Sequence, residues 1–385
     1  MDYQLSKLHK LLKESMERFC REEIAPAAAF LDTCSAQEAA DTMKANFKRL
    51  SREGYTGLLL DDDLIGQAVA GEELAKACPA TFLSALSSLT ALGRMVKRYG
   101  SPKQQEEVLS ELAGGEKIGA MACNEGDAGA DMGGMTTTAD YKGGRWILNG
   151  NKDIVTNAPF ADFFLVLAWT KRDAALEAGT TFFLIDRHME GLSVGDTLET
   201  MGLCGARAAG ISLENCSLPE DAVLGGAPGV GWAQMQSAMD DIRIAVSVLC
   251  LGIGMACMED STRHAKAKKA FGKPIGLFEG VGAKLATMFT FNDIGRMMVY
   301  RAAWGREQFD PESPILSSCA KLYTTEAVEQ IASMAMQVHG GHGYLKGETV
   351  ERLYRDARFA ALAYGTSEMQ RAFIAKDTLD NFKAA

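Results

Sequence analysis

The chain has 385 residues, which is long for one hydrophobic core, so we expect two or three packed units. Its net charge of −10 and the lack of a concentrated basic run argue against a nucleic-acid-binding protein. No stretch reaches about 18 uninterrupted apolar residues, so the sequence predicts no membrane span.

The cysteines predict neither a zinc site nor a disulfide framework. All nine are scattered, and none forms a Cys-x-x-Cys pair. We therefore expect reduced, mostly buried thiols and no metal. The N-terminal stretch, residues 1–7, lacks the apolar core of a signal peptide. These features favour a cytoplasmic protein.

Residues 1–118 have the apolar spacing of helices. Leu8, Leu12 and Phe19 repeat at helical intervals, and Gly54 and Gly100 mark turns between segments. Residues 61–66 lead directly into the next helix without a long loop. We predict a helical N-terminal domain over residues 1–118.

Residues 119–225 change character. Short runs rich in β-branched and aromatic residues, such as 163–169 and 180–185, alternate with turn residues such as Asn149 and Gly150. We predict a middle β domain, a barrel or sandwich, over residues 119–225.

Residues 226–385 return to helical spacing. A long helix is expected from Met239 toward Lys268. Ser367 and Gln370 form an S-x-x-Q pattern that predicts a capping box at the start of the last helix. We predict a C-terminal four-helix bundle over residues 226–385, which makes the fold class α+β.

Two glycine-rich turns lie in this last part, at residues 337–344 and 363–371. Gly340 and Gly341 carry no Cβ, so the backbone there can approach a ligand closely. The second turn opens a helix, whose N-terminus favours anions. Together they suggest a phosphate-bearing cofactor held between helices; the alternative is two ordinary helix–helix turns.

The motifs in these turns resemble a known family. Gln-x-x-Gly-Gly-x-Gly-Tyr, Arg-Asp-x-Arg and Gly-Thr-Ser-Glu-x-Gln-Arg are similar to the C-terminal signature of the acyl-CoA dehydrogenases. Residues 123–131, 149–157, 240–243 and 268–275 match further family motifs in the same order. The resemblance implies an FAD enzyme of the acyl-CoA dehydrogenase fold that oxidises acyl-CoA thioesters at Cα and Cβ.

The resemblance also implies a set of site residues. Those expected to contact FAD are Asn124, Thr156, Lys268, Phe271, Gln337, Gly340, Gly341, Thr366 and Glu368. Those expected to contact the substrate are Asp240, Arg243 and Gly365. Two departures stand out: Ala130 replaces a Ser that often contacts the CoA phosphate arm, and Lys268 replaces an Arg, losing its bidentate fork.

Some of these residues have simpler explanations. Thr156 could bond to its own backbone at a strand end, and Arg243 could form a helix-surface ion pair with Asp240. We weigh the functional roles above these alternatives because the neighbouring residues also match the family.

The usual catalytic base is absent. Tyr364 occupies the position of the family's catalytic Glu, and Ile242 occupies the second known position. A neutral phenol is a poor base at pH 7 but a fair proton donor. Asp241 is one residue away from the second position, which rotates its side chain by about 100° on a helix. We expect Asp241 to be solvated or capping, with a surrogate base as the alternative.

Three hypotheses follow. The protein acts on an acyl thioester with altered chemistry, either enoyl reduction with Tyr364 as proton donor or removal of a β-substituent. It could instead be an ordinary dehydrogenase whose base comes from elsewhere, or a non-catalytic subunit of a heteromeric enzyme. The implied partners are an acyl-CoA or acyl-carrier thioester, an electron-transfer flavoprotein and further copies of the chain. In the expected homotetramer, Lys268, Phe271 and the Gln337 turn reach the FAD of a neighbouring subunit.

Overall fold

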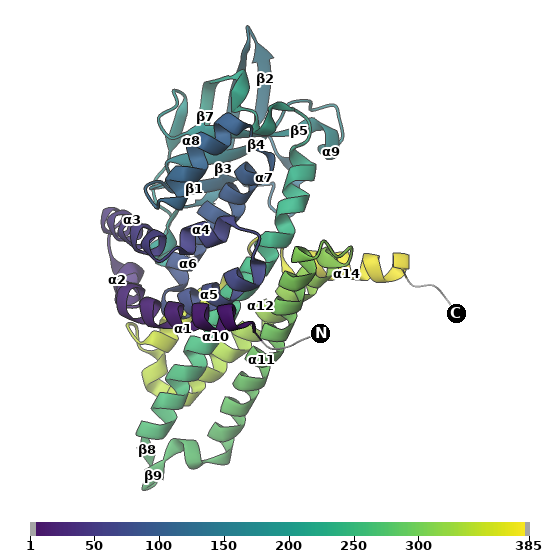
Figure 1. Cartoon of the computed structure of the whole chain (residues 1–385). Coiled ribbons are helices and arrows are strands. Elements are labelled where there is room, and N and C mark those ends of the chain that lie inside the picture. The colour runs from purple at the N-terminus through teal and green to yellow at the C-terminus, as the bar shows by residue number, and fades with distance from the viewer. Residues whose placement is uncertain (1–4, 382–385) are drawn as a thin grey trace.

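The computed structural model describes residues 5–381, in which the middle of the chain forms a sheet and the segments before and after it form helices (Figure 1). The first residues of the stretch 1–7 lie outside this range. The sheet lies at one end of the molecule, and a small hairpin, β8–β9, lies at the opposite end of the long helices. The predicted fold class is confirmed; the domain boundaries at residues 118 and 225 stay a prediction.

The helices before the sheet form one packed group. Their bounds are α1 Lys7–Phe19, η1 Cys20–Ile24, α2 Ala27–Thr33, α3 Ala36–Arg52, α4 Tyr55–Leu60, α5 Leu64–Ala77, α6 Pro79–Ala85, η2 Leu86–Gly93, α7 Arg94–Tyr99 and α8 Pro102–Ala113. Residues 61–63 lead directly into α5, as the sequence predicted. The Asp63 side chain caps this helix by accepting a hydrogen bond from the Gly66 amide at 2.7 Å.

The segment η2 is a π-helix, a widened turn that often occurs at functional sites. It is buried along its whole length, including the hydroxyls of Ser87 and Ser88. The Ser88 hydroxyl accepts a hydrogen bond from the Gly119 amide at 2.8 Å. The π-helix is therefore attached directly to the first strand of the sheet.

The middle of the chain forms a seven-stranded sheet with β1 parallel to β4 and β5 paired with the other side of β4. The strands are β1 Gly119–Ala122, β2 Thr138–Lys142, β3 Arg145–Thr156, β4 Phe163–Trp169, β5 Thr180–Asp186, β6 Leu192–Val194 and β7 Ala208–Pro219. Short helices connect them: η3 Met132–Gly134, α9 Leu176–Gly179, η4 Cys204–Ala206, η5 Glu220–Ala222 and η6 Leu224–Gly226.

Strand β4 is buried on both faces, so its alternate side chains enter two different cores. Phe163 and Leu165 pack with the helices. Phe164 and Val166 pack in a second core to which β1, β2, β3, β5 and β7 all contribute. The sheet therefore curls around a core of its own while its other face covers the helices.

The chain after the sheet forms the helical bundle. Its elements are α10 Gly231–Ala267, β8 Lys269–Ala270, β9 Lys273–Pro274, η7 Ile275–Leu277, α11 Glu279–Glu307, α12 Ser313–His339, η8 Gly340–Tyr344, α13 Thr349–Arg358 and α14 Ser367–Asn381. Helix α10 begins at Gly231, eight positions before the predicted start at Met239, because its first turns already pack against the sheet.

Helix α10 is the core helix of the bundle. It crosses α5 so closely that a Cβ on Gly252 would lie 2.4 Å from the Cβ of Ala75. It is the one helix among residues 5–381 with the length and apolar composition of a membrane span. However, 72% of its most apolar 18-residue stretch is buried inside the protein. Burial of this kind is typical of a core helix.

The predicted capping box on the last helix is wrong by one residue. The Thr366 hydroxyl, not Ser367, accepts a hydrogen bond from a first-turn amide, that of Met369 (3.3 Å). The Gln370 side chain instead donates to the Gly365 carbonyl at 3.2 Å. The bend before the helix leaves Ser367 inside its first turn, so its hydroxyl cannot act as the cap.

Candidate active site

Tyr364 lies in the bend between α13 and α14, with a positive φ of 51°, and Gly365 follows with a φ of 89°. The Tyr364 side chain packs against the helical core. Burial raises the pKa of its phenol well above the ordinary value, while a hydrogen bond with the Ser87 side chain opposes the shift and the nearby Cys123 thiol adds to it. The phenol is therefore protonated across the physiological pH range.

Asp241 is not solvated, and that prediction is wrong. Its carboxylate is 3% exposed and accepts hydrogen bonds from Arg94 (3.1 Å), Arg98 (2.9 Å) and Arg306 (2.7 Å). Burial raises the pKa of Asp241, but the three guanidinium groups outweigh burial and hold the pKa below its ordinary value. Both oxygens are engaged, so Asp241 is not available as a surrogate base; Ile242 beside it is fully buried.

Asp240 and Arg243 form the ion pair that the sequence offered as an alternative, at 3.0 Å, but the pair is buried rather than on the surface. The Ser317 hydroxyl also donates to Asp240 at 3.0 Å. The Arg243 guanidinium lies over the Phe373 ring of α14, and its Nε has no hydrogen-bond partner among the described residues. The pair therefore lies beneath the helix that Tyr364 precedes, while its contact with substrate stays a prediction.

The loop that follows β1 is held by a buried ion pair. The Lys152 ammonium, with a fully buried side chain, lies 2.9 Å from Glu125 and donates to the Cys123 carbonyl at 3.0 Å. The carboxylate of Glu125 also accepts from the amide and hydroxyl of Thr136, each at 2.6 Å. Burial raises the pKa of Glu125, but these hydrogen bonds and Lys152 lower it to about 2. The backbone around Asn124 is thereby fixed beside the site.

Thr156 ends β3, paired with Ala208, and is followed by the fully buried Asn157. The Asn157 amide donates to the carbonyls of Ser84 (2.9 Å) and Gly119 (3.0 Å), and its oxygen accepts from the Ser84 hydroxyl (2.7 Å). This amide joins the sheet to α6, next to the π-helix that carries Ser87. Thr156 is thus held at the junction of the sheet and the helices.

The other predicted FAD residues lie elsewhere, at the far ends of α10 and α12. They are Lys268, Phe271, Gln337, Gly340 and Gly341, all of them exposed. His264 and His339 join the two helix ends, with ring centroids 4.3 Å apart, and His339 lies 3.3 Å from Asp260. The Lys268 segment and the Gln337 turn are therefore held together in one subunit.

The two groups of residues do not meet within one chain. The Lys321 side chain of α12 contacts Gly365, whereas Gln337 lies sixteen positions further along the same helix. At 1.5 Å per residue the separation is about 24 Å. Figure 1 shows the same arrangement, with the β8–β9 hairpin at the end of the bundle remote from the sheet.

Both groups have room and polar atoms for a phosphate-bearing cofactor. A Cβ on Gly340 or Gly341 would meet no atom within 4 Å, so the backbone of that turn is open to a ligand. At the start of α14, the Ser367 hydroxyl and the Gln370 carbonyl oxygen are buried without a hydrogen-bond partner among the described residues. Unsatisfied polar atoms of this kind fit a site completed by a ligand.

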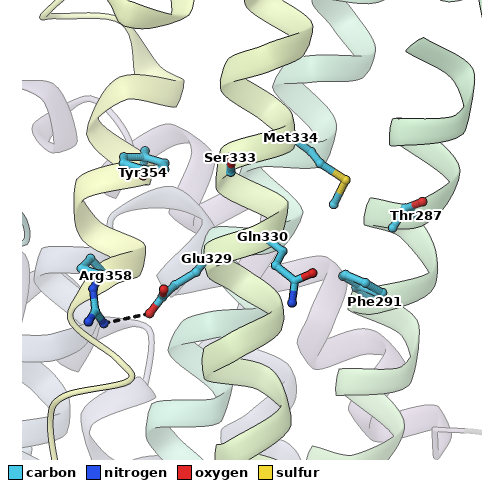
Figure 2. A pocket seen from close by; sticks show the side chains of 8 residues that line it. All are labelled: Thr287, Phe291, Glu329, Gln330, Ser333, Met334, Tyr354 and Arg358. Atoms are coloured by element: carbon cyan, nitrogen blue, oxygen red, sulfur yellow. Dashed lines mark hydrogen bonds and ion pairs between the residues drawn. The ribbon is translucent and has the colours of Figure 1, made fainter. Parts of the chain in front are cut away.

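A cavity of about 460 Å³ opens between α11, α12 and α13 (Figure 2). Phe291, Met334 and Tyr354 line it, and the ion pair between Arg358 and Glu329 (2.9 Å) closes one side. None of the predicted site residues lines this cavity. It is therefore separate from the candidate active site.

Sequence reasoning missed two residues that contact the Tyr364 bend. Ser87 gave no signal, because a serine in an apolar segment has no distinctive spacing. Lys321 gave a weak signal, since a lysine stands there among small and apolar residues of the predicted helical bundle. Its side chain is fully buried and donates to the Gly365 carbonyl at 2.5 Å.

Comparison with known proteins adds the family. The chain matches the N-terminal, middle and C-terminal domains of acyl-CoA dehydrogenase over residues 6–116, 120–216 and 229–379. The human mitochondrial short-chain specific acyl-CoA dehydrogenase is 32% identical, over 99% of this chain and 92% of its own. The 3-(aryl)acrylate reductase of Clostridium sporogenes is 32% identical, over 96% of this chain and 98% of its own. The solved FAD complex of PigA superposes with a TM-score of 0.89 at 27% identity, covering 98% of this chain and 99% of its own.

The buried ion pair makes acid stability testable. Because the folded-state pKa of Glu125 is depressed, its contribution to stability is lost as pH falls from about 4.5 to about 2. Glu125→Gln leaves Lys152 buried without its carboxylate. We expect it to lower the free energy of unfolding at pH 7 by about 3–5 kcal/mol and to flatten the loss of stability in acid. Urea unfolding at pH 7 and pH 3.5 measures both effects.

The control is Glu177→Gln, since Glu177 is exposed on α9. It should change neither quantity. An unchanged acid dependence in Glu125→Gln would show that this pair does not set the acid stability.

Proposed function

The chain belongs to the acyl-CoA dehydrogenase family, and on that premise we propose that it acts on the Cα–Cβ bond of an acyl thioester with Tyr364 at the reacting Cα. It is an acyl-CoA dehydrogenase-type oxidoreductase and a flavoprotein whose cofactor is FAD. When bound, the cofactor would supply hydride transfer at Cβ. The protein's own residues must then manage the proton at Cα.

The protonation state of Tyr364 carries the proposed direction. A phenol with its ordinary pKa of about 10 is protonated at neutral pH. Burial raises the pKa of Tyr364 further, so its hydroxyl cannot remove a Cα proton at that pH. It can donate one, because the carbanion or enolate that develops at Cα in a reduction is a much stronger base than a phenolate. We therefore infer reduction of an α,β-unsaturated thioester. The relative from Clostridium sporogenes, named as a reductase, supports this direction.

The predicted FAD-contacting and substrate-contacting residues near Tyr364 take the remaining roles. Asn124, Thr156, Thr366 and Glu368 would contact FAD within the subunit that carries Tyr364. Asp240, Arg243 and Gly365 would hold the thioester beneath α14, where the Nε of Arg243 has no hydrogen-bond partner within residues 5–381. The backbone of the Asn124 loop is preorganised for this task by the Lys152–Glu125 pair.

Oxidation is the second candidate, and the human relative named as a dehydrogenase favours it. It requires a base other than residues 242 and 364, and Asp241 is engaged by three arginines. Removal of a β-substituent that leaves its bonding electrons on Cβ, where a proton then adds, would spare the Cα proton and is a further outcome. A non-catalytic subunit would bind FAD without responding to any thioester.

The assembly we propose is a homotetramer. Lys268, Phe271, Gln337, Gly340 and Gly341 would contact the FAD of a neighbouring copy, because one chain holds them about 24 Å from Gly365. Helix α11 also exposes a row of large apolar side chains, namely Phe289, Ile294, Met297 and Trp304. Such a face is typical of an interaction surface.

We further propose a cytoplasmic location, with an electron-transfer flavoprotein as redox partner and CoA or an acyl-carrier protein as thioester carrier.

A titration of the holoprotein under anaerobic conditions tests the function. We expect enoyl thioesters to reoxidise the chemically reduced flavin, and saturated thioesters to leave the oxidised flavin unbleached. The visible spectrum reports both reactions. Bleaching by saturated thioesters alone would replace reduction with oxidation, and no response to either set would indicate the non-catalytic subunit.

Variants of Tyr364 test its role. Tyr364→Phe removes the proton donor and should slow native turnover by about 10²–10⁴-fold with FAD still bound. Tyr364→Glu places a partly desolvated carboxylate at Cα and should create or raise saturated acyl-CoA oxidation. Stopped-flow flavin absorbance measures both rates. The control is Tyr141→Phe on β2, which should behave as wild type; full activity in Tyr364→Phe would mean that the phenol only fills space.

The shared-site arrangement has its own test. Phe271 is 95% exposed, so Phe271→Ala should not affect the stability of a monomer. If its ring reaches a neighbouring FAD, truncation should weaken FAD binding by more than about 1 kcal/mol. Equilibrium dialysis measures the binding, and light scattering should give a tetramer. Phe309→Ala, at a site 89% exposed, is the control. A monomer that holds a full complement of FAD would contradict the arrangement.

A further inference from the structure

The bend that carries Tyr364 is strained. Tyr364 and Gly365 both have positive φ, at 51° and 89°, and for a tyrosine this conformation is unfavourable. Such a bend persists only when its surroundings hold it in place. The contacts that hold this one are therefore part of how the phenol is aimed.

Two buried donors converge on the single carbonyl of Gly365. The Lys321 ammonium donates to it at 2.5 Å and the Gln370 amide at 3.2 Å. The Lys321 side chain is 0% exposed and the Gln370 side chain is 1% exposed. The φ of 89° at Gly365 favours glycine, and a Cβ there would lie 2.8 Å from the Gln370 side-chain nitrogen, which would have to shift.

Burying the Lys321 ammonium at this position costs free energy of folding. Among the described residues this carbonyl is its one recorded hydrogen-bond acceptor, and no carboxylate lies within ion-pair distance. Burial lowers the pKa of its ammonium to about 8; Cys250, Glu368 and Glu326 oppose that shift and Arg243 adds to it. An apolar side chain of similar volume would avoid the cost of burying the charge. A cost of this kind is expected where a residue serves function.

We propose that Lys321 is a positioning residue for the reaction at Tyr364. By anchoring the Gly365 carbonyl from α12, it fixes the bend between α13 and α14 and aims the Tyr364 hydroxyl at the substrate Cα, without contacting substrate itself. This inference rests on the proposed function, in which Tyr364 acts on the Cα proton. Gln370 keeps the carbonyl hydrogen-bonded when Lys321 is replaced, so loss of the anchor need not unfold the site.

The kinetic test uses Lys321→Met in the holoenzyme. We expect flavin reoxidation by a saturating enoyl thioester to slow by about 10- to 100-fold, as for a reacting group that is slightly misplaced, with little change in KM and no fall in melting temperature. The control is Thr325→Val, one turn along α12, whose buried hydroxyl donates only to backbone carbonyls of its own helix. It should keep the wild-type rate.

A double-variant cycle separates positioning from a general structural role. In the Tyr364→Phe background, Lys321→Met should add little further loss, because the hydroxyl that it aims is already absent. Equal losses in both backgrounds, or a change in KM alone, would overturn the proposal. Should Lys321→Met fail to fold, Lys321→Gln, which is polar but too short to reach the carbonyl in the same way, replaces it.

Hydrogen exchange tests the anchor without any reaction. In the FAD-bound protein lacking thioester, Lys321→Met should raise amide exchange over residues 359–370 and leave the sheet unchanged. Unaltered exchange would overturn the anchoring role even if the enzyme is active. A wild-type protein that reacts with no thioester would overturn the proposed function, and exchange would then decide the anchoring role by itself.

Discussion

The buried ion pair between Lys152 and Glu125 is the constraint on which the candidate site depends. A fully buried ammonium costs least when its charge is paired and its remaining protons have acceptors, and Lys152 has both, in the Glu125 carboxylate and the Cys123 carbonyl. The same carboxylate accepts hydrogen bonds from the start of the segment that leads into β2. One charge on β3 therefore fixes a loop that would otherwise be free to move.

The junction between the sheet and the helices extends this constraint to the reacting residue. Asn157, which follows β3, makes two hydrogen bonds with Ser84 on α6 and one with Gly119 on β1. The π-helix that follows α6 brings Ser87 to the phenol of Tyr364. Tyr364 itself comes from a strained bend anchored by Lys321 on α12. The sheet, the first helical group and the bundle thus each contribute one contact, so the site exists only when all three are packed together.

The long helices of the bundle explain why one subunit holds two separate halves of a site. Helix α12 carries Lys321 near one end and Gln337 at the other, and a straight helix cannot bring the two ends together. The His264–His339 contact fixes the remote half, as the Gly365 carbonyl fixes the near half. In the proposed homotetramer, assembly would be part of cofactor binding, because each cofactor would contact the near half of one copy and the remote half of another.

The sequence by itself determined the order of helical and β segments and the family, because these depend on local periodicity and on residue identity; the absence of both usual bases stays a prediction from the same motifs. It could not place Asp241, because its arginine partners on α7 and α11 are distant in the chain. In the sequence alone, each of these arginines has the pattern of an exposed residue. The sequence also misplaced the last helix cap, since the S-x-x-Q spacing selects Ser367, whereas the backbone direction set by the Tyr364 bend makes Thr366 the cap. Only tertiary packing decided that Lys321 is buried against the Gly365 carbonyl, because burial depends on what covers a side chain and not on its neighbours in sequence.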